Sequence, residues 1–372
     1  MCKQKPPARL PEEAQTYRPF SAAFPNRISR SRRSNSASGP APTGQQFPRG
    51  VAGFSQTTRY RQGALALLLI GCLLAACAPQ EQKIVRFMAM GDVPYHLPED
   101  FVRFERMIGA INAAAPDFSL HVGDIKSGGT PCSDAYFETI KNYFDAFEQP
   151  LIYTPGDNEW TDCHREACGG YEPEERLDKL RQLFFAGEQS QGKQPMPLQR
   201  QNSWEGFEKF PENARWQQGG VTFGTLHVIG SNNNFKLDSG ALNDEFYERE
   251  LANNFWLEQL FAQAREAQSK GLVLVLHAGL NYQTRDERNG HASFVTILRK
   301  EVLDFGKPVL LLYGDRHRFM VDQPLRDSSG RTMTNFTAVQ VFGDRDMHAV
   351  QVEIDPDNPN LFSIDPFYVA GN

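Results

Sequence analysis

Five short segments of the sequence each place side chains that can bind a metal directly after an apolar run. In chain order they are Met90-Gly-Asp92, Val122-Gly-Asp124, Gly156-Asp157-Asn-Glu159, Val275-Leu-His277 and Gly314-Asp315-Arg-His317. Carboxylate and imidazole ligands together suit Mn, Fe, Zn or Ni better than Ca or Mg. The pattern therefore predicts a metal centre, where a bound cation can activate water for attack on a substrate.

Each of these segments needs a strand that delivers its ligand to a shared edge. The apolar runs at 84–90, 118–122, 150–154, 272–277 and 308–313 are expected to form those strands. Helical spacing of apolar residues follows the first two runs. Alternating strands and helices, with acidic residues at the strand ends, are typical of a layered α/β fold. The glycine before each aspartate is expected to let the backbone turn sharply.

The body of the chain is strongly acidic. Of the 39 basic and 45 acidic residues, 11 and 2 respectively lie in residues 1–76, so residues 77–372 carry a formal net charge of −15. Without a basic patch, such a body is not expected to bind nucleic acid. The polar, glutamine-rich stretch near 187–220 is interpreted as an insertion into a single domain at 84–372.

The residues before this body are interpreted as a leader and a linker. Residues 1–60 have no hydrophobic period, which indicates a disordered extension or a stretch upstream of the true start of translation. Residues 61–76 combine a basic flank with a short apolar run, as a signal peptide does. The run ends in a four-residue box that resembles the bacterial lipobox and whose last residue, Cys77, would be lipidated. Residues 77–83 form the linker.

The order of the ligand segments resembles that of the calcineurin-like metallophosphoesterases, over roughly residues 85–320. The resemblance implies a four-layer α/β/β/α sandwich that holds two divalent metal ions, with Mn, Fe or Zn the expected metals. It also implies hydrolysis of phosphomonoesters or phosphodiesters, by attack of a hydroxide that bridges the two metals. The expected substrate is therefore a small-molecule phosphate ester.

Roles for individual residues follow from the same resemblance. Asp92 and His317 would bind the first metal, and Asp124 would bridge both metals and so position the attacking hydroxide. The remaining ligands would bind the second metal, and they are Asp157, His277 and Asp315.

Two departures from the family pattern concern the first metal and the leaving group. The family motif D-x-H reads Asp92-Val-Pro94 here, so its histidine ligand is missing. Tyr95 or His96 could reach the site in its place. Asn158 stands in the position of the family histidine that assists the leaving group. Its amide can donate a hydrogen bond to a phosphoryl oxygen but cannot protonate the leaving group.

A third departure changes the charge of the second metal's ligands. Asp157 and Asp315 replace neutral family ligands, which would favour harder metals such as Mn²⁺, Fe or even Ca²⁺. Arg165 and Arg316 are candidates for binding the substrate phosphate, because a guanidinium group matches its geometry.

Three cysteines of the body allow more than one pairing. Cys132 and Cys163 follow the second and third ligand segments, and a disulfide between them would brace the site. The rival pairing joins Cys163 to Cys168. A zinc site is less favoured, because the paired C-x-x-C spacing is absent.

The sequence therefore predicts a metal-dependent phosphoric ester hydrolase, exported to the bacterial cell envelope and held at the membrane by a lipid on Cys77. The alternative is a lipoprotein of the same fold that has lost catalysis and acts as a binding or scaffold protein. The missing histidines favour this alternative.

Overall fold

The computed structural model describes residues 84–237, 243–283, 286 and 288–372. The predicted extension at 1–60, the signal peptide at 61–76, the linker at 77–83 and the lipidation site Cys77 lie outside the described residues. Among the helices that are described, none is long and apolar enough to cross a membrane.

The first of the two sheets has five strands, and the three that form its centre and one edge are parallel. Its order is β12 (Phe362–Phe367), β11 (Ala349–Ile354), β1 (Val85–Met90), β2 (Phe118–His121) and β3 (Leu151–Tyr153). Strands β1, β2 and β3 pair in parallel, whereas β11 is antiparallel to both β1 and β12. The C-terminal ends of the three parallel strands therefore lie at one edge of this sheet.

The second sheet has seven strands, of which β6, β7, β8 and β10 are parallel. Its order is β4 (Gln199–Arg200), β5 (Ala214–Gln218), β6 (Val221–Thr225), β7 (Gly271–Val275), β8 (Val309–Tyr313), β10 (Phe336–Gln340) and β9 (Met320–Asp322). The stretch 187–220 thus contributes two strands, β4 and β5, to this sheet. The three outer strands β4, β5 and β9 are paired antiparallel to their neighbours.

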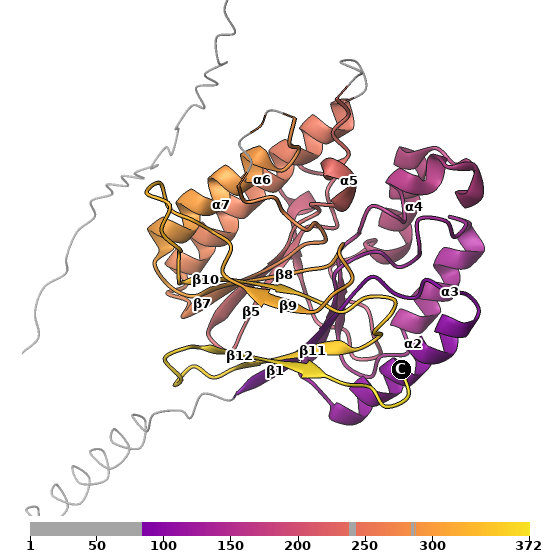
Figure 1. Cartoon of the computed structure of the whole chain (residues 1–372), viewed down its shortest axis with the longest axis horizontal. Helices are drawn as coiled ribbons and strands as arrows, with labels where there is room; N and C mark the ends of the chain where they lie inside the picture. The colour runs from indigo at the N-terminus through magenta and orange to yellow at the C-terminus, as the bar shows by residue number, and fades with distance from the viewer. Residues whose placement is uncertain (1–83, 238–242, 284–285, 287) are drawn as a thin grey trace, which may run out of the picture. The chain divides into compact units, whose positions relative to one another are not determined.

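Helices cover the outer face of each sheet, which gives four layers (Figure 1). On the first sheet lie α2 (Glu99–Ala114), α3 (Asp134–Phe144) and α4 (Pro173–Phe184), and on the second lie α6 (Asp244–Glu266) and α7 (Ala292–Phe305). Short helices join these elements: η1 (Thr161–His164), η2 (Glu166–Cys168), η3 (Gln201–Ser203) and α5 (Gly230–Asn233). One apolar core fills each interface between layers. The predicted α/β/β/α sandwich is confirmed.

The amino-acid pattern explains why these helices form where they do. In α2, Phe104, Ile108 and Ile111 repeat at helical spacing and are buried against the first sheet. Helix α3 begins after Ser133, whose side chain accepts a hydrogen bond from the Tyr136 backbone N–H. Helix α7 ends at Gly306, which has φ 66° and so suits a left-handed cap. These local signals fix the ends of the helices that support the sheets.

Candidate metal centre

The predicted ligands meet because the two sheets present the C-terminal ends of their parallel strands to one another. Asp92, Asp124 and Asp157 follow the three parallel strands of the first sheet. His277 and Asp315 follow two neighbouring parallel strands, β7 and β8, of the second sheet. Segments more than two hundred residues apart in the sequence, such as those of Asp92 and Asp315, therefore supply one site.

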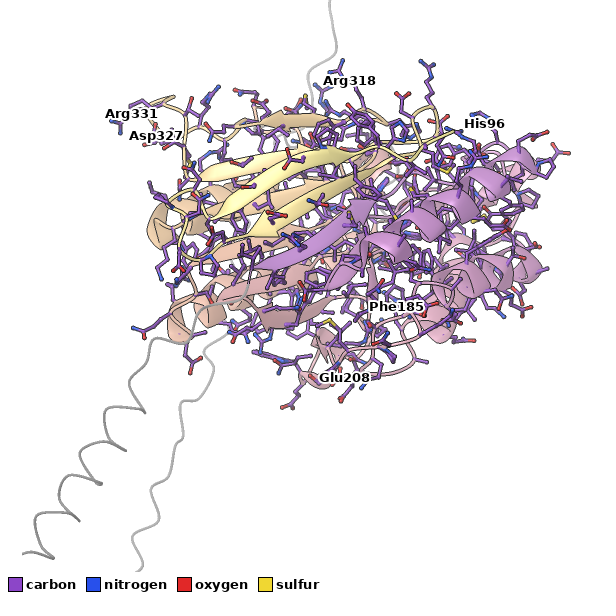
Figure 2. The ribbon with its side chains drawn as sticks, turned by 90° about the horizontal axis from the view of Figure 1, so that it is seen from below. His96, Phe185, Glu208, Arg318, Asp327 and Arg331 are labelled. Carbon is purple, nitrogen blue, oxygen red and sulfur yellow. A yellow bond between two sulfur atoms is a disulfide. The ribbon has the colours of Figure 1, made fainter. Side chains whose placement is uncertain are left out.

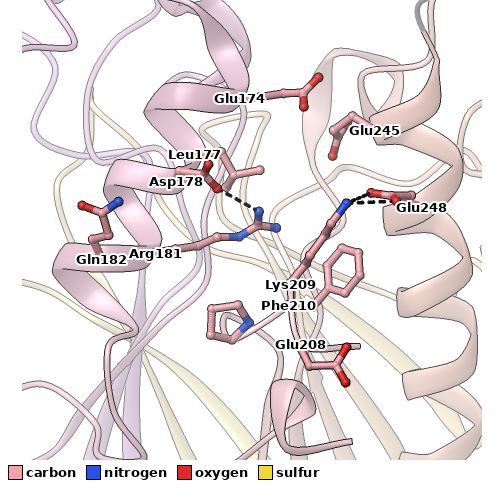
Figure 3. A pocket seen from close by; sticks show the side chains of 11 residues that line it. Glu174, Leu177, Asp178, Arg181, Gln182, Glu208, Lys209, Phe210, Glu245 and Glu248 are labelled. Atoms are coloured by element: carbon pink, nitrogen blue, oxygen red, sulfur yellow. Dashed lines mark hydrogen bonds and ion pairs between the residues drawn. The ribbon is translucent and has the colours of Figure 1, made fainter. Parts of the chain in front are cut away.

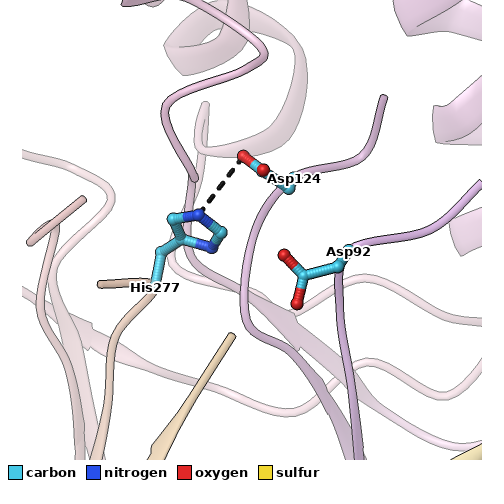
Figure 4. A group of neighbouring side chains, drawn as sticks. All are labelled: Asp92, Asp124 and His277. Atoms are coloured by element: carbon cyan, nitrogen blue, oxygen red, sulfur yellow. Dashed lines mark ion pairs between the residues drawn. The ribbon is translucent and has the colours of Figure 1, made fainter. Parts of the chain in front are cut away.

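The side chains form two overlapping groups that could each hold a metal ion. Asp92, Asp124 and His277 make the first group, and Asp157, His277 and Asp315 make the second, with the ligand atoms of each group within 4.8 Å of one another. Figure 4 shows His277 of the first group facing Asp124 and Asp92. The distances from His277 Nε2 to Asp124 Oδ1 and Asp157 Oδ1 are 3.4 and 3.1 Å. His277 thus joins the two groups.

Three ligand atoms in these groups are buried and lack a hydrogen-bond partner among the described residues. They are Asp92 Oδ2, Asp157 Oδ1 and His277 Nε2. A buried polar atom without a partner costs free energy, and native proteins rarely leave one. Cations bound by the two groups would give each of these atoms a partner, so the residues present fit a metal centre.

The orientation of His277 is fixed by its second ring nitrogen. Nδ1 lies 2.9 Å from the Val122 carbonyl oxygen, which can only accept a hydrogen bond, so Nδ1 carries the proton. Nε2 therefore faces the carboxylates. Metal-binding histidines commonly donate their other N–H to a carbonyl or carboxylate in this way.

His317 is oriented by a residue that the sequence analysis missed. Its Nδ1 lies 2.8 Å from Asp344 Oδ1, and its Nε2 lies 3.6 Å from Asp92 Oδ1. Asp344 follows β10 in the segment Val341-Phe-Gly343-Asp344, which repeats the glycine–aspartate pattern of the ligand segments. That repeat could have revealed it.

Tyr95 and Asn158 both contact the carboxylate that is predicted to bridge the metals. Tyr95 Oη donates to Asp124 Oδ2 at 2.7 Å, and Asn158 Nδ2 reaches the same oxygen at 2.6 Å. Asn158 Nδ2 also lies 3.0 Å from Tyr95 Oη. On the other side, the Asn158 backbone N–H donates to Asp124 Oδ1 at 3.0 Å. Asp124 is thereby held on both oxygens.

The other predicted site residues lie at different distances from this group. His96 Nε2 contacts Asp344 Oδ2 at 2.9 Å, and its side chain is 69% exposed, at the edge of the molecule that Figure 2 shows. Arg165 donates to the Gly128 carbonyl and pairs with Asp162, beside Asn158. Arg316 donates to the Gly279 carbonyl. Of the candidates for the missing family histidine, Tyr95 reaches the ligands and His96 does not.

The glycines of the ligand segments follow our expectation at one position only. Gly123 has a left-handed backbone with φ 99°. Elsewhere the left-handed backbone belongs to the ligands, since Asp92, Asp124 and Asp315 have φ of 55°, 55° and 77°. Gly156 and Gly314 are needed for close approach instead: a Cβ there would lie 2.2 Å from Asp124 Oδ1 and 2.6 Å from Asp92 Oδ2. The expectation that the glycine itself makes the sharp turn therefore holds at Gly123 and is wrong at Gly156 and Gly314.

Burial is the largest single influence on the pKa of each of the three carboxylates Asp92, Asp124 and Asp157. It raises the pKa of Asp92 to about 6, against the opposing effect of His277. It also holds the pKa of Asp124 well above its ordinary value. For Asp157, burial acts in the same direction, but contacts with His277 and Ser231 hold the pKa below its ordinary value. The site thus contains carboxylates that would exchange a proton for a cation.

Cys132 and Cys163 form a disulfide next to Asn158. This is one of the two pairings that the sequence allowed. The two residues are bonded, and each sulfur lies 3.9 Å from the Asn158 carbonyl oxygen. Cys168 is buried and forms no disulfide with any residue that the structure describes. Lys126 Nζ donates to the same Asn158 carbonyl at 2.7 Å, so this loop is braced from several sides.

The sequence was also compared with models of protein families. Residues 85–319 match the model described as calcineurin-like phosphoesterase. This chain belongs to that family. The resemblance seen in the sequence is confirmed, because the match spans both halves of the sandwich and every ligand segment.

Solved structures similar to this phosphoesterase-family chain share little sequence with it. One is GAP50, the anchor in the inner membrane complex of Plasmodium, with 12% identity, a TM-score of 0.43, and coverage of 78% of this chain and 90% of that one. A dimetal phosphatase from Danio rerio has 12% identity, a TM-score of 0.46, and coverage of 77% and 96%. A purple acid phosphatase from yellow lupin has 13% identity, a TM-score of 0.47, and coverage of 79% and 53%. A comparison with curated proteins found no match.

A separate cleft lies between α4 and α6 of this calcineurin-like phosphoesterase (Figure 3). Its volume is about 430 Å³. Acidic side chains dominate its walls, and none of the candidate metal ligands named above is among its lining residues. The charged ones are Glu174, Asp178, Arg181, Glu208, Lys209, Glu245 and Glu248.

Proposed function

We propose that this protein is a phosphoesterase that uses two divalent metal ions, with Mn, Fe or Zn the expected metals. The observation that carries the proposal is the pair of overlapping ligand groups joined by His277, with three buried ligand atoms that have no hydrogen-bond partner in the described part of the chain. Such a pair matches a site for two cations that bind one phosphoryl group together. Family membership supports the same reaction class.

Each metal would have its own ligands. Asp92 and His317 would hold the first, Asp157 and Asp315 the second, and Asp124 and His277 lie between them. When bound, the two cations supply Lewis-acid activation of water and of the phosphoryl oxygens.

The neighbouring residues would orient the substrate. Asn158 presents its amide beside Asp124, where it can donate to a phosphoryl oxygen. Arg165 and Arg316 lie on two sides of the ligands, because Arg165 is next to Asn158 and Arg316 is next to Gly279, whose N–H donates to Asp315. Their guanidinium groups suit the oxygens of a phosphate ester.

Metal content and hydrolysis together test this proposal. Metals bound per purified chain would be counted, and hydrolysis of p-nitrophenyl phosphate and bis(p-nitrophenyl) phosphate would be followed with added Mn²⁺. We expect two metals per chain and hydrolysis that Asp124→Asn abolishes. A folded wild-type chain with no bound metal and no hydrolysis would refute the proposal and favour a binding or scaffold protein of the same fold.

We also propose that the protein is exported to the bacterial cell envelope and anchored by a lipid on Cys77. The apolar run at 64–76 behind a basic flank and the box ending in Cys77 support this. Expression of the wild type in a bacterium should yield a membrane-bound form whose N-terminal peptide begins with acylated Cys77. The Cys77→Ala variant should lose the lipid. An unmodified Cys77 in the wild type would contradict the proposal.

A further inference from the structure

We infer that Arg249 is a positioning residue for the second metal, acting through Ser231 on Asp157. The inference rests on the dinuclear function proposed above and adds a residue of α6 that is remote in sequence from every ligand segment. The contacts run from Arg249 to the segment 230–234, and from that segment to the Asp157 carboxylate. This segment contains the short helix α5 and is here called the left-handed loop.

The left-handed loop binds one carboxylate oxygen of Asp157 and leaves the other for a metal. Ser231 Oγ donates to Asp157 Oδ2 at 2.6 Å, which occupies that oxygen. Asp157 Oδ1 lies 3.1 Å from His277 Nε2 and has no hydrogen-bond partner among the described residues. Ser231 therefore leaves one oxygen of Asp157 for a metal and fixes its direction.

The loop also approaches the second metal's carboxylates closely. A Cβ at Gly230 would lie 2.5 Å from Asp157 Oδ1 and 2.6 Å from Asp315 Oδ1. The absence of a side chain at Gly230 thus keeps open the space between the two carboxylates. A shift of this loop would change that space directly.

The loop has an unfavourable backbone that other residues must hold. Ser231, Asn232, Asn233 and Asn234 have φ of 49°, 56°, 56° and 58° in succession. Left-handed backbone is unfavourable for an L-residue, although asparagine tolerates it better than most. Four such residues in a row need compensating contacts from outside the loop.

Arg249 supplies these contacts with all five of its N–H groups. The side chain is fully buried, and it donates to the Asn233 side chain and carbonyl, to the His227 carbonyl, and twice to Glu245. Glu245 in turn accepts from Asn234 Nδ2 at 2.8 Å. A lysine has three donors on one atom and cannot reproduce this pattern.

The same guanidinium also contacts the turn that carries Asp157. It lies 5.5 Å from the centre of the Trp160 ring. The Trp160 backbone N–H donates to the Asp157 carbonyl at 3.3 Å. Arg249 therefore touches both segments whose relative position sets the Asp157 carboxylate.

Binding of Mn²⁺ to the metal-free protein, measured by calorimetry and by electron paramagnetic resonance, tests the inference. We expect Arg249→Lys and Ser231→Gly to weaken one of the two Mn²⁺ sites by roughly 10–100-fold and to leave the other unchanged. Ser231→Gly removes the hydroxyl but suits the left-handed backbone, so its effect reports the hydrogen bond alone.

Matched controls come from similar contacts far from the site. Arg265→Lys changes an arginine of the same helix that pairs with Glu301, and Ser329→Ala removes a hydroxyl that donates to Asp327. Both should bind two Mn²⁺ with wild-type affinity. If Ser231→Gly keeps both wild-type affinities, the inference is overturned even if Arg249→Lys fails to fold. A wild type that binds fewer than two ions would overturn the proposed function as well.

Discussion

The hydroxyl of Tyr95 lies 2.7 Å from Asp124 Oδ2 and 3.4 Å from His317 Nε2. It thus stands between the carboxylate predicted to bridge the metals and a ligand of the first metal. The family histidine missing from Asp92-Val-Pro94 would have served this region. One residue beyond that position, Tyr95 brings an oxygen to the ligands.

Removing this hydroxyl tests its role. Tyr95→Phe deletes a donor to Asp124 and an acceptor for Asn158, and we expect Mn²⁺ affinity to fall by roughly 10–100-fold, with a lower rate of hydrolysis. Calorimetry would measure the affinity. Tyr143→Phe is the control, because its hydroxyl contacts only exposed Glu105 among the contacts described here. Wild-type affinity in Tyr95→Phe would assign the ring to packing against His317.

Asp344 provides a second test, directed at the first metal. Its Oδ1 lies 2.8 Å from His317 Nδ1 and so holds Nε2 toward Asp92. In Asp344→Asn the negative charge is lost and the imidazole is less firmly oriented. We expect one Mn²⁺ site to weaken by roughly 10–100-fold.

The pattern of loss across variants makes this result specific. Arg249→Lys and Asp344→Asn should weaken different sites, so the double variant should lose both. Asp327→Asn, in an exposed turn, should lose neither. If the two single variants weaken the same site, the assignment of ligands to two metals is wrong.

Asn158 predicts a dependence on the leaving group. Because its amide has no proton to give, hydrolysis of alkyl esters should be much slower than hydrolysis of aryl esters, whose leaving groups need no protonation. Asn158→His should raise the ratio of the alkyl rate to the aryl rate by up to about 100-fold. That figure is the smallest rate enhancement that a general acid typically supplies. Kinetics with p-nitrophenyl phosphate and an alkyl phosphate measure the ratio. An unchanged ratio would mean that another residue already supplies the proton.

The ligand segments could be predicted from the sequence because each is local. An apolar strand, a glycine and an aspartate lie within a few residues, and Asp92, Asp124 and Asp157 came from that pattern. The layers were predictable for the same reason, since strand and helix periods alternate along the chain.

The residues that support the ligands could not be predicted in this way. Ser231 and Arg249 act through contacts between a loop, a helix and a strand end that are far apart in the sequence. Neither residue type is unusual where it stands. Asp344 differs, because its glycine–aspartate signal was present and lacked only a predicted role.

The raised pKa of Asp92 predicts how the stability of the metal-free protein depends on pH. Its ordinary value of 3.8 rises to about 6 on burial, so between these values the folded state binds more protons than the unfolded state. The free energy of unfolding should therefore fall as pH rises from about 4 to 6. Urea unfolding of the metal-free protein measures this slope.

The same carboxylate should make metal binding weaker at low pH. Below about pH 6 a proton competes for Asp92, so Mn²⁺ affinity should increase as pH rises through that value.

The control for the stability prediction is Asp92→Asn. Its side chain has no proton to lose, so the free energy of unfolding of the metal-free variant should depend less on pH. A slope equal to that of the wild type would show that other groups cause it.

The disulfide gives a prediction that joins stability to the site. Cys132 and Cys163 are 31 residues apart, and a bridge of that span contributes about 3–4 kcal/mol in the chain-entropy description. We expect dithiothreitol to lower the free energy of unfolding of the wild type by about that amount. The double variant Cys132→Ser, Cys163→Ser should have the lower stability with or without reductant. Cys168→Ala keeps the bridge and should still respond to dithiothreitol.

Because both sulfurs lie 3.9 Å from the Asn158 carbonyl, reduction should also slow hydrolysis before the protein unfolds. An equal rate with the bridge open would show that Lys126 and Asp124 alone hold Asn158 in place.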